Sequence, residues 1–348
     1  MRCPRLNELP PPPAGRSGWP WSEESPPLPA ARPDGTPWPT ITVSTPNYNF
    51  QDFIEETIRS VLLQGYPELE YIVTDDGSTD GSAEIIRKYE PWLAHWETGE
   101  NRGQSHAINQ GWRRGQGDIF AYLNSDDCLK PGALEVVAGS IKPDEGRHIV
   151  FGDCDVIDEK GKKIGYCRGR LPDPGNLLRY WEHDFTIPQP SVFFHRDILQ
   201  RVGYLDETFH YVMDYDYWVR VSRHYGFYYI PQSLGIMRDH LRAKTSTVIY
   251  ELLEPEWFRI LKKSRGDLSP FTRGKYYLLA RNYRSRILRI SAYARRRDIP
   301  FKKFQKIIFL SLAANPLNIF NPKFASALFR ATAGHSLADR VKCILRRD

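Results

Sequence analysis

Apolar residues follow two alternating spacings along the chain after residue 40. The β-branched run Ile41–Thr45 is typical of a buried strand, and apolar residues then recur at helical spacing from Phe53 to Leu62. The pattern continues with predicted strands over 70–74 and 118–123 and predicted helices over 78–89 and 104–114. Alternating strands and helices predict an α/β fold, in which a mostly parallel central sheet is flanked by helices and ligands bind at the carboxyl ends of the strands.

The pattern is less regular after Pro131. Apolar and aromatic runs predict strands over 148–152, 156–166, 192–194 and 227–230, the last of them ending before Pro231, and a helix over 211–224. The first two strands would form a hairpin that brings Cys154 and Cys167 face to face. The sequence leaves open whether these two cysteines form a disulfide or remain buried thiols. Five scattered cysteines without a CxxC pair favour thiols in a reducing compartment.

Proline is dense in residues 1–39, which include four consecutive prolines at 10–13. Because proline blocks helix and sheet hydrogen bonding, this segment is predicted to be extended or partly disordered. Trp19, Trp21 and Trp38 are uncommon in a free linker. They favour a strap that docks its indoles on the following domain over a free leader.

Charge is distributed unevenly over the 348 residues. The net charge is +6, but residues 251–348 hold 22 Lys and Arg against seven Asp and Glu, so the remaining 250 residues carry a net charge of −9. An acidic body with a basic tail indicates two roles in one chain. No stretch approaches about 18 uninterrupted apolar residues, and the N-terminus lacks an apolar core segment, so the expectation is neither a transmembrane nor a secreted protein.

Two acidic clusters directly follow predicted strands. Asp75-Asp76-Gly77 is suited to present a carboxylate or backbone groups to a nucleotide base. Taken alone, however, the motif favours a capped helix start, with Ser78, Thr79 or Asp80 as the cap. In Ser125-Asp126-Asp127 the adjacent carboxylates repel each other. A Mg²⁺ or Mn²⁺ ion that also binds substrate phosphates would relieve that repulsion. The alternative is a solvated acidic turn.

A third cluster lies on the predicted helix 211–224. Asp216 and Arg220 are four residues apart, so they are predicted to form a structural ion pair. Asp214 lies among aromatic residues that would partly desolvate it. Desolvation raises the pKa of a carboxylate and suits it to act as a general base. An exposed helix aspartate is the alternative.

Taken together, seven motifs resemble the family 2 glycosyltransferases, in the order and spacing of that family. The motifs are Thr42–Asn49, Thr74–Gly81, Asn101–Asn109, Leu123–Asp127, Gln189–Ser191, Val202–Glu207 and Met213–Trp218. The resemblance spans about residues 40–245. It implies a Rossmann-like GT-A catalytic domain over 40–250, preceded by the Pro-rich segment 1–39 and followed by a basic, mainly helical C-terminal extension over 251–348.

The resemblance also implies roles for individual residues. The catalytic base would be Asp214, although Met213 stands where the family often has Glu. The nucleotide sugar would contact Pro46, Tyr48, Asn49, Asp76, Gln104 and Asp126. The Mg²⁺ or Mn²⁺ ion would be held by Asp127 and Asp126, with His240 as a further ligand from a basic loop.

The function implied is transfer of a sugar from a nucleotide-diphosphate sugar to a hydroxyl of a glycan or lipid-linked acceptor, by a single inverting displacement. UDP-sugars are the first expectation, with GDP- and dTDP-sugars open. Surface polysaccharide or glycolipid biosynthesis in the cytoplasm, at the inner face of the membrane, would use such an enzyme. The alternatives are a non-catalytic nucleotide-sugar or glycan-binding protein and a basic membrane-docking scaffold.

The basic tail allows two interpretations. Residues 276–297 are rich in arginine with apolar residues at helical spacing, and the uncharged run 307–322 is interrupted by Asn315 and Pro316. Such a segment suits an anionic membrane surface, and it equally suits a helical extension packed on the catalytic domain. Nucleic acid is not expected as a partner, because aromatic stacking motifs are missing and the acidic body would repel phosphate.

Overall fold

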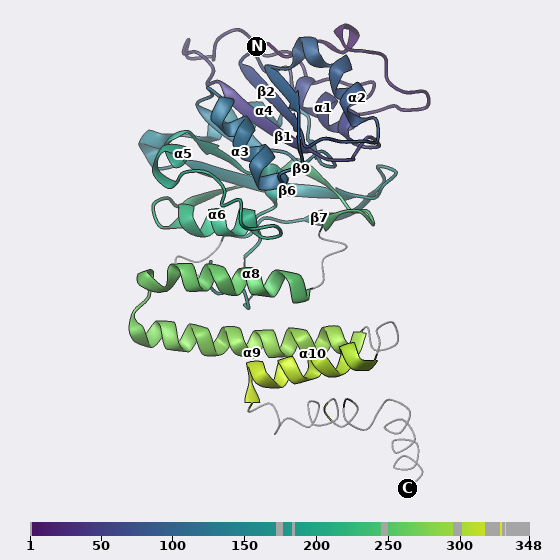
Figure 1. Ribbon diagram of the computed structural model, residues 1–348. Helices are drawn as coiled ribbons and strands as arrows, with labels where there is room; N and C mark the ends of the chain where they lie inside the picture. Colours follow the sequence, from purple (N-terminus) through teal and green to yellow (C-terminus); the bar gives the residue numbers. More distant parts are fainter. Residues whose placement is uncertain are drawn as a thin grey trace. The chain divides into compact units, whose positions relative to one another are not determined.

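The computed structural model describes residues 2–171, 177–182, 185–244, 250–294 and 301–316, together with Leu328 and Ala331 (Figure 1). The chain forms two compact units. The first comprises Met1–Leu177 and Asp184–Ser246, and the second comprises Leu178–His183 and Thr247–Asp348.

A mixed sheet of nine strands, counted over the described residues, forms the centre of the first unit. The strands are β1 Ile41–Asn47, β2 Leu69–Asp75, β3 His95–Thr98, β4 Ile119–Tyr122, β5 Cys128–Leu129, β6 Ile149–Ile157, β7 Lys163–Cys167, β8 Phe193–His195 and β9 Phe227–Arg238. Their order is β3-β2-β1-β4-β8-β6-β9-β5, with β7 paired to β6. Strands β3, β2, β1 and β4 run parallel to one another, so their carboxyl ends lie at one edge, whereas β8 is antiparallel to β4.

Helices cover both faces of this sheet (Figure 1). They are α1 Ile54–Leu62, α2 Ser82–Lys88, α3 Gln104–Arg114, α4 Ala133–Ser140, α5 Asp197–Val202 and α6 Met213–Ser222. Ile41 and Val43 of β1 pack with α1, α2 and α4 in the main hydrophobic core. The opposite side chain of β1, Ser44, faces α3, where a Cβ on Gly111 would collide with its hydroxyl. The glycine therefore allows α3 to approach the sheet closely.

Trp112 of α3 connects the second face of the sheet to α6. Its ring lies 5.2 Å from that of Phe194 and 5.5 Å from that of Tyr217. Aromatic pairs at these separations stabilise by about 0.5–1.5 kcal/mol each beyond the area they bury. This packing fixes the helix that carries Asp214.

Two sequence predictions need correction. The helix predicted to begin at Ser78, Thr79 or Asp80 instead begins at Ser82, after Gly81 with φ +95° and no side-chain cap at that position. The hydroxyl of Ser78 is already hydrogen-bonded to Asp75. The strand predicted to end before Pro231 continues to Arg238, because the pairing of β9 with β6 shifts register around Pro231 and so does not need the N–H that proline lacks.

The β6–β7 hairpin forms, but its strands have other bounds than the predicted 148–152 and 156–166. Strand β6 runs unbroken from Ile149 to Ile157, and the turn follows it. Cys154 and Cys167 are opposite each other in the ladder, as predicted, and both are free thiols. The expectation of thiols rather than a disulfide is confirmed.

The Pro-rich segment is mostly extended, with a short 3₁₀ helix at Leu6–Glu8, and is docked on the rest of the first unit. Trp21 and Trp38 are buried, and the indole N–H of Trp19 donates to the carbonyl of Leu129 at 2.9 Å. Arg59 of α1 is fully buried, and its guanidinium donates to the carbonyls of Pro10, Pro20 and Trp21 at 2.9–3.0 Å. The segment is therefore a strap held by its backbone carbonyls as well as by its indoles.

The second unit contains α8 Tyr250–Lys263, the short 3₁₀ helix Ser264–Asp267, α9 Pro270–Ala294 and α10 Phe301–Ala314. Tyr180 stacks on Trp257 of α8 with ring centroids 5.3 Å apart. The hydroxyl of Ser285 donates to the carbonyl of Ser311 at 2.7 Å and joins α9 to α10. Among the described helices, none combines the length and the apolar character needed to cross a membrane. The predicted apolar run beyond residue 316 lies outside the described residues.

Candidate active site

The carboxyl ends of β1, β2 and β4 bring together two of the three acidic clusters. Asn47 at the end of β1 is the register partner of Asp75 at the end of β2, and Ser44 of β1 is the partner of Tyr122 at the end of β4. The loops that follow these strands therefore emerge at one edge of the sheet, as the sequence predicted.

The two aspartates after β2 have different surroundings. Asp75 is an internal hydrogen-bond acceptor for Asn47 Nδ2 at 2.7 Å, Thr98 Oγ1 at 2.7 Å and the Ser78 N–H at 3.0 Å. Burial raises the pKa of Asp76 to about 6, while hydrogen bonds from backbone N–H groups oppose that rise. Asp75 thus shapes the loop, and Asp76 is the carboxylate whose protonation changes near pH 6.

The loop after β1 carries three predicted site residues. Pro46 is buried within the strand, while Tyr48 keeps 46% of its surface exposed. Asn49 adopts the left-handed region with φ +58°, which asparagine tolerates better than most residues. Its Oδ1 accepts from the Thr79 N–H at 2.8 Å, and its N–H donates to Ser78 Oγ at 2.8 Å. Asn49 therefore joins the loops after β1 and β2.

Asp126 and Asp127 lie in the turn after β4 and differ in burial. Asp127 is buried, and its Oδ1 accepts from the backbone N–H of Arg238 at 3.0 Å. Burial and the adjacent charge of Asp126 raise the pKa of Asp127 well above its ordinary value. Asp126 is partly exposed, and its Oδ2 lies 3.0 Å from Nε2 of His240. The repulsion expected from adjacent carboxylates is thus present in the fold.

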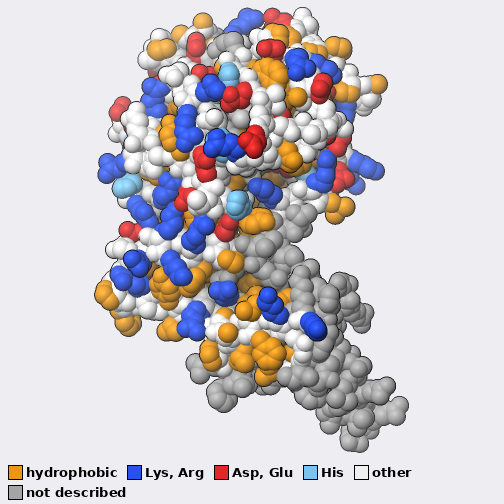
Figure 2. Space-filling view, viewed as in Figure 1, with side chains coloured by type: hydrophobic (Ala, Val, Ile, Leu, Met, Phe, Trp, Pro, Cys, Tyr) orange, Lys and Arg blue, Asp and Glu red, His pale blue; other side chains and the backbone are white. Residues whose placement is uncertain are grey.

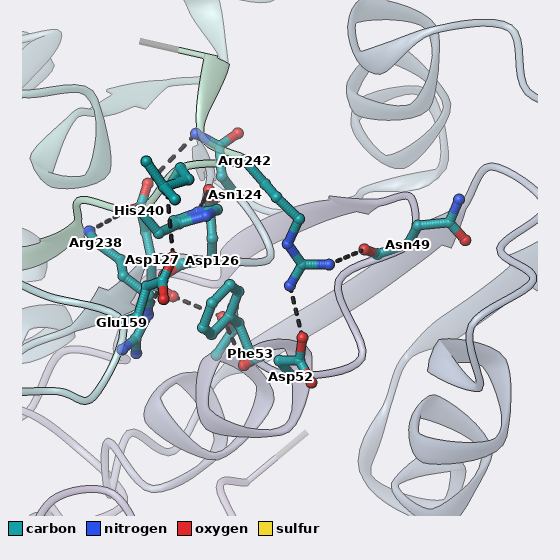
Figure 3. A network of polar contacts seen from close by, with 12 residues as sticks. Asn49, Asp52, Phe53, Asn124, Asp126, Asp127, Glu159, Arg238, His240 and Arg242 are labelled. Atoms are coloured by element: carbon teal, nitrogen blue, oxygen red, sulfur yellow. Dashed lines mark hydrogen bonds and ion pairs between the residues drawn. The ribbon is translucent and has the colours of Figure 1, made fainter. Parts of the chain in front are cut away.

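The end of β9 and the residues after it lie across this turn (Figure 3). His240 is buried with its ring 5.6 Å from Phe50 and 4.8 Å from Phe53, and its Nδ1 has no hydrogen-bond partner among the described residues. Arg242 pairs with Asp52 at 2.6 Å. The basic loop therefore contacts both the Asp126–Asp127 turn and the loop after β1.

Asp214 lies in the first turn of α6 and is partly buried. Burial raises its pKa, and the charge of Lys244 opposes the rise. The predicted desolvation is therefore confirmed. The predicted structural pair is confirmed as well, because Asp216 Oδ2 accepts from Arg220 Nε at 2.8 Å.

Tyr122 shows that the second and third acidic clusters are near each other. Its phenol is buried at the end of β4, and its pKa is raised well above the ordinary value by burial and by the charges of Asp214 and Asp127. One buried ring therefore lies within electrostatic reach of both carboxylates, although α6 and β4 are far apart in the sequence.

A small cleft beside these groups is lined by Arg102, Gly103, Gln104, Ser105, Glu207, Phe209, His210 and Lys244. Gln104 connects the cleft to the acidic turn, because its Nε2 donates to Asn124 Oδ1 at 2.6 Å and its Oε1 accepts from Lys244 at 2.6 Å. Asn124 in turn donates to Asp127 Oδ2 at 3.4 Å.

Comparison with known proteins identifies the family. Residues 42–203 match the family described as Glycosyl transferase family 2. An uncharacterized glycosyltransferase of Rickettsia prowazekii is 30% identical over 239 residues, an alignment that covers 65% of this chain and 72% of the relative. The chain belongs to glycosyl transferase family 2. This membership confirms the family, and the enzyme class, expected from the motifs.

Other similar proteins agree with this family 2 glycosyltransferase assignment. The putative teichuronic acid biosynthesis glycosyltransferase TuaG of Bacillus subtilis is 42% identical over 106 residues, which is 29% of this chain and 41% of TuaG. The structure of S. aureus TarS 1-349 with UDP-GlcNAc has a TM-score of 0.57 at 15% identity, covering 85% of this chain and 92% of that chain. The mannosyltransferase PcManGT of Pyrobaculum calidifontis, with GDP-Man and Mn²⁺, has a TM-score of 0.51 at 19% identity, covering 86% and 90%. The two structures confirm the predicted GT-A fold.

The residues predicted to bind a metal ion offer two carboxylates and one imidazole. Over the described residues, no three His, Cys, Asp or Glu side chains are arranged to hold a metal ion. Asp126 and Asp127 supply two carboxylates, and a Mg²⁺ ion is usually bound by one or two carboxylates plus substrate phosphates. The pair therefore fits a metal that arrives with a diphosphate. The proposed ligand role of His240 stays a prediction, since its Nε2 already contacts Asp126.

Sequence reasoning missed several polar residues of this site. Asn124 lies within the motif Leu123–Asp127, but the sequence predicts no role for it. It predicts none for Arg238 or Lys244 either, which lie on the two sides of His240. No feature of the sequence indicated a role for Glu56 on α1. It lies 3.0 Å from Arg238 in the fold, and neither composition nor spacing connects residues so far apart in the chain.

Proposed function

We propose that this glycosyltransferase moves a sugar from a nucleotide-diphosphate sugar, with UDP-sugars as the favoured donors, to a hydroxyl of a glycan or lipid-linked acceptor. The observation that carries the proposal is the partly buried carboxylate of Asp214, with its raised pKa, which acts on the same buried Tyr122 as Asp127 of the acidic pair. A base and a diphosphate-binding pair are the two parts that a displacement at the anomeric carbon requires.

Asp214 is the general base in this mechanism. Its carboxylate takes the proton of the acceptor hydroxyl while the hydroxyl oxygen bonds to the anomeric carbon from the face opposite the diphosphate. The bond from that carbon to the diphosphate oxygen breaks in the same step, so the configuration inverts. The transition state has oxocarbenium character, by analogy with glycoside hydrolysis. A carboxylate with a raised pKa is a stronger base for this transfer than an exposed one.

The donor is held by the three loops at the sheet edge. Asp76 accepts a hydrogen bond from the base, beside Pro46, Tyr48 and Asn49, and Gln104 and Asp126 contact the ribose or sugar. Asp127 and Asp126 would hold a Mg²⁺ or Mn²⁺ ion, with His240 as a further candidate. When bound, such an ion supplies Lewis-acid stabilisation of charge on the departing diphosphate.

Similar proteins support parts of this proposal. The complex of TarS with UDP-GlcNAc supports a UDP-sugar donor, and the complex of PcManGT with GDP-Man and Mn²⁺ supports a divalent metal and leaves GDP-sugars open. The similarity to TuaG, a putative teichuronic acid biosynthesis glycosyltransferase, supports a role in surface polysaccharide biosynthesis.

The test is transfer by the purified full chain with a panel of UDP-, GDP- and dTDP-sugars, with Mn²⁺ and a glycan or lipid-linked acceptor. Binding is followed by thermal shift, because a ligand that binds only the folded state raises the melting temperature. The anomeric configuration of the product is read by NMR. Retention of configuration would contradict the mechanism. Binding of a nucleotide sugar without transfer or hydrolysis would favour a non-catalytic binding protein.

Nucleotide binding is expected to weaken as the pH falls through about 6. Asp76 accepts a much stronger hydrogen bond from the base when it is ionised than when it is protonated, and burial raises its pKa to about 6. UDP affinity measured by calorimetry without metal should therefore be nearly constant above pH 7 and fall about tenfold between pH 7 and pH 5. The Asp76→Asn variant should bind weakly at all these pH values. A wild-type affinity that does not change between pH 7 and pH 5 would contradict the role of Asp76.

A lipid-linked acceptor would place the enzyme in the cytoplasm at the inner face of the membrane. Helices α9 and α10 would then contact the lipid. Described side chains on these helices include Phe271, 83% exposed, and Leu278, 63% exposed, and the sequences of the two helices contain no Asp or Glu. Figure 2 shows hydrophobic and basic side chains over this unit. An apolar and basic surface suits anionic lipid.

The membrane proposal predicts co-sedimentation with phosphatidylglycerol vesicles and much less with phosphatidylcholine vesicles. Replacing Phe271 and Leu278 together by Ser should weaken this binding about tenfold. The matched control is Ile164→Ser, which changes an exposed apolar residue of the first unit. Equal sedimentation of the double variant and the wild type would contradict the assignment of this surface.

A further inference from the structure

Arg238 is a buried cation that contacts the acidic turn without neutralising it through a side-chain ion pair. Its backbone N–H donates to Asp127 Oδ1 at 3.0 Å, and its Nε donates to the backbone carbonyl of Asp126 at 3.1 Å. Its Nη1 donates to the carbonyl of Asp158 at 3.2 Å. The guanidinium also lies over the ring of Phe53, 4.9 Å from its centroid. The arginine therefore joins β9, the acidic turn and the start of α1.

Glu56 of α1 provides the counter-charge of this arginine. Its Oε2 lies 3.0 Å from Nη2 of Arg238, and both side chains are almost completely buried. Neither atom has a hydrogen-bond partner among the described residues, so the pair interacts by charge rather than through an aligned hydrogen bond. In a buried setting charges interact more strongly than in water.

The contacts of Arg238 place Glu56 one residue away from the acidic turn. The backbone N–H of Arg238 donates to Asp127 Oδ1 and its Nε donates to the carbonyl of Asp126, while its Nη2 lies 3.0 Å from Glu56 Oε2. The charge of Glu56 therefore acts on the arginine that contacts both residues of the pair proposed to bind the metal.

The consequence concerns the affinity of the acidic turn for a cation. Without Glu56, the positive charge of Arg238 would stand uncompensated beside Asp126 and Asp127. It would repel a divalent ion and act as a fixed counter-ion for the two carboxylates. We infer that Glu56 sets the cation affinity of the Asp126–Asp127 pair by neutralising and positioning Arg238. This inference rests on the proposed function, since it takes the pair as the metal and diphosphate site.

The test compares Glu56→Gln, which removes the charge and keeps the shape, with Glu56→Asp, which keeps the charge. Mn²⁺ binding in the presence of UDP is measured from the electron paramagnetic resonance signal of free Mn²⁺, so the readout does not depend on turnover. Glu56→Gln is expected to raise the Mn²⁺ dissociation constant about tenfold, and Glu56→Asp to raise it by about threefold or less. At saturating Mn²⁺, the turnover number of both should approach that of the wild type.

The matched control is Glu55→Gln on the same helix, which removes a carboxylate that accepts from the Tyr89 hydroxyl at 2.8 Å instead. Thermal unfolding is recorded for every variant. A lowered melting temperature with unchanged Mn²⁺ binding would show that the Glu56–Arg238 pair is only structural and would overturn the inference. Asp127→Asn is measured in parallel. If it leaves Mn²⁺ binding unchanged, the proposed site fails, whereas a loss there with no effect of Glu56→Gln overturns this inference alone.

Discussion

The Asp214→Asn variant is expected to lose about 10²- to 10⁴-fold in turnover while it still binds the nucleotide sugar. Asparagine has nearly the same shape as aspartate but cannot accept the proton of the acceptor hydroxyl, and a positioned general base contributes a factor of this size. Donor affinity should stay within about twofold, because the mechanism gives Asp214 no contact with the nucleotide. Turnover and donor binding are measured on the same preparation, the latter by calorimetry.

The matched control for this variant is Asp216→Asn on the same helix. It removes the pairing with Arg220 at 2.8 Å and should lower the free energy of unfolding by about 1–3 kcal/mol while transfer continues. Asp214→Asn should change stability in the opposite direction. Burial raises the pKa of Asp214, so at neutral pH its ionised form destabilises the fold, and the neutral amide relieves that cost. Near-normal turnover of Asp214→Asn would refute its assignment as the base.

The second large effect is expected from Asp127→Asn, with a loss of at least about 100-fold in kcat/KM. A buried carboxylate whose pKa is raised by burial and by Asp126 gains most from a bound cation, and the amide cannot replace it. Chelation with EDTA should abolish wild-type transfer, and added Mn²⁺ should restore it. In the variant, Mn²⁺ should restore little activity at any concentration used for the wild type.

Asp155→Asn is the control that distinguishes the loss of a metal ligand from the loss of any buried carboxylate. Asp155 is almost as buried as Asp127, but it is paired with Lys130 at 3.0 Å and Lys163 at 2.6 Å. Its replacement should lower stability without changing the response to Mn²⁺. If Asp127→Asn responds to Mn²⁺ as the wild type does, another group must hold the metal.

The elements with strong periodicity could be predicted from the sequence. The helix at Gln104–Arg114 was predicted with its observed bounds, and the buried β-branched run became β1. In contrast, β3 at His95–Thr98 is polar and only half-buried, so its identity as a strand comes from pairing with β2 rather than from its own residues. The two-residue β5 likewise exists only through its pairing with β9. Tertiary contact decides such segments.

The candidate site was likewise only partly predictable from the sequence. The sequence predicts that Asp76, Asp126 and Asp127 lie at one edge of the sheet, because each follows a strand and the carboxyl ends of parallel strands meet there. The partners of these residues come from elsewhere: His240 reaches Asp126 from the end of β9, and Lys244 reaches Gln104. Such pairs depend on the path of β9 through Pro231 to Arg238. The sequence prediction ended that strand too early, so spacing could not place Lys244, and only the family resemblance placed His240 beside Asp126.

The docked strap has a consequence for biosynthesis on the ribosome. Trp19 hydrogen-bonds to Leu129, a residue 110 positions later in the chain, and Arg32 bonds to Ala138, 106 positions later. At the usual rates of translation, roughly 5–20 s separate the synthesis of each side chain from that of its acceptor. During that interval the indole of Trp19 and the guanidinium of Arg32 lack these acceptors. The strap can therefore make its contacts with Arg59 early, but it completes its native contacts only after most of the parallel part of the sheet has been made.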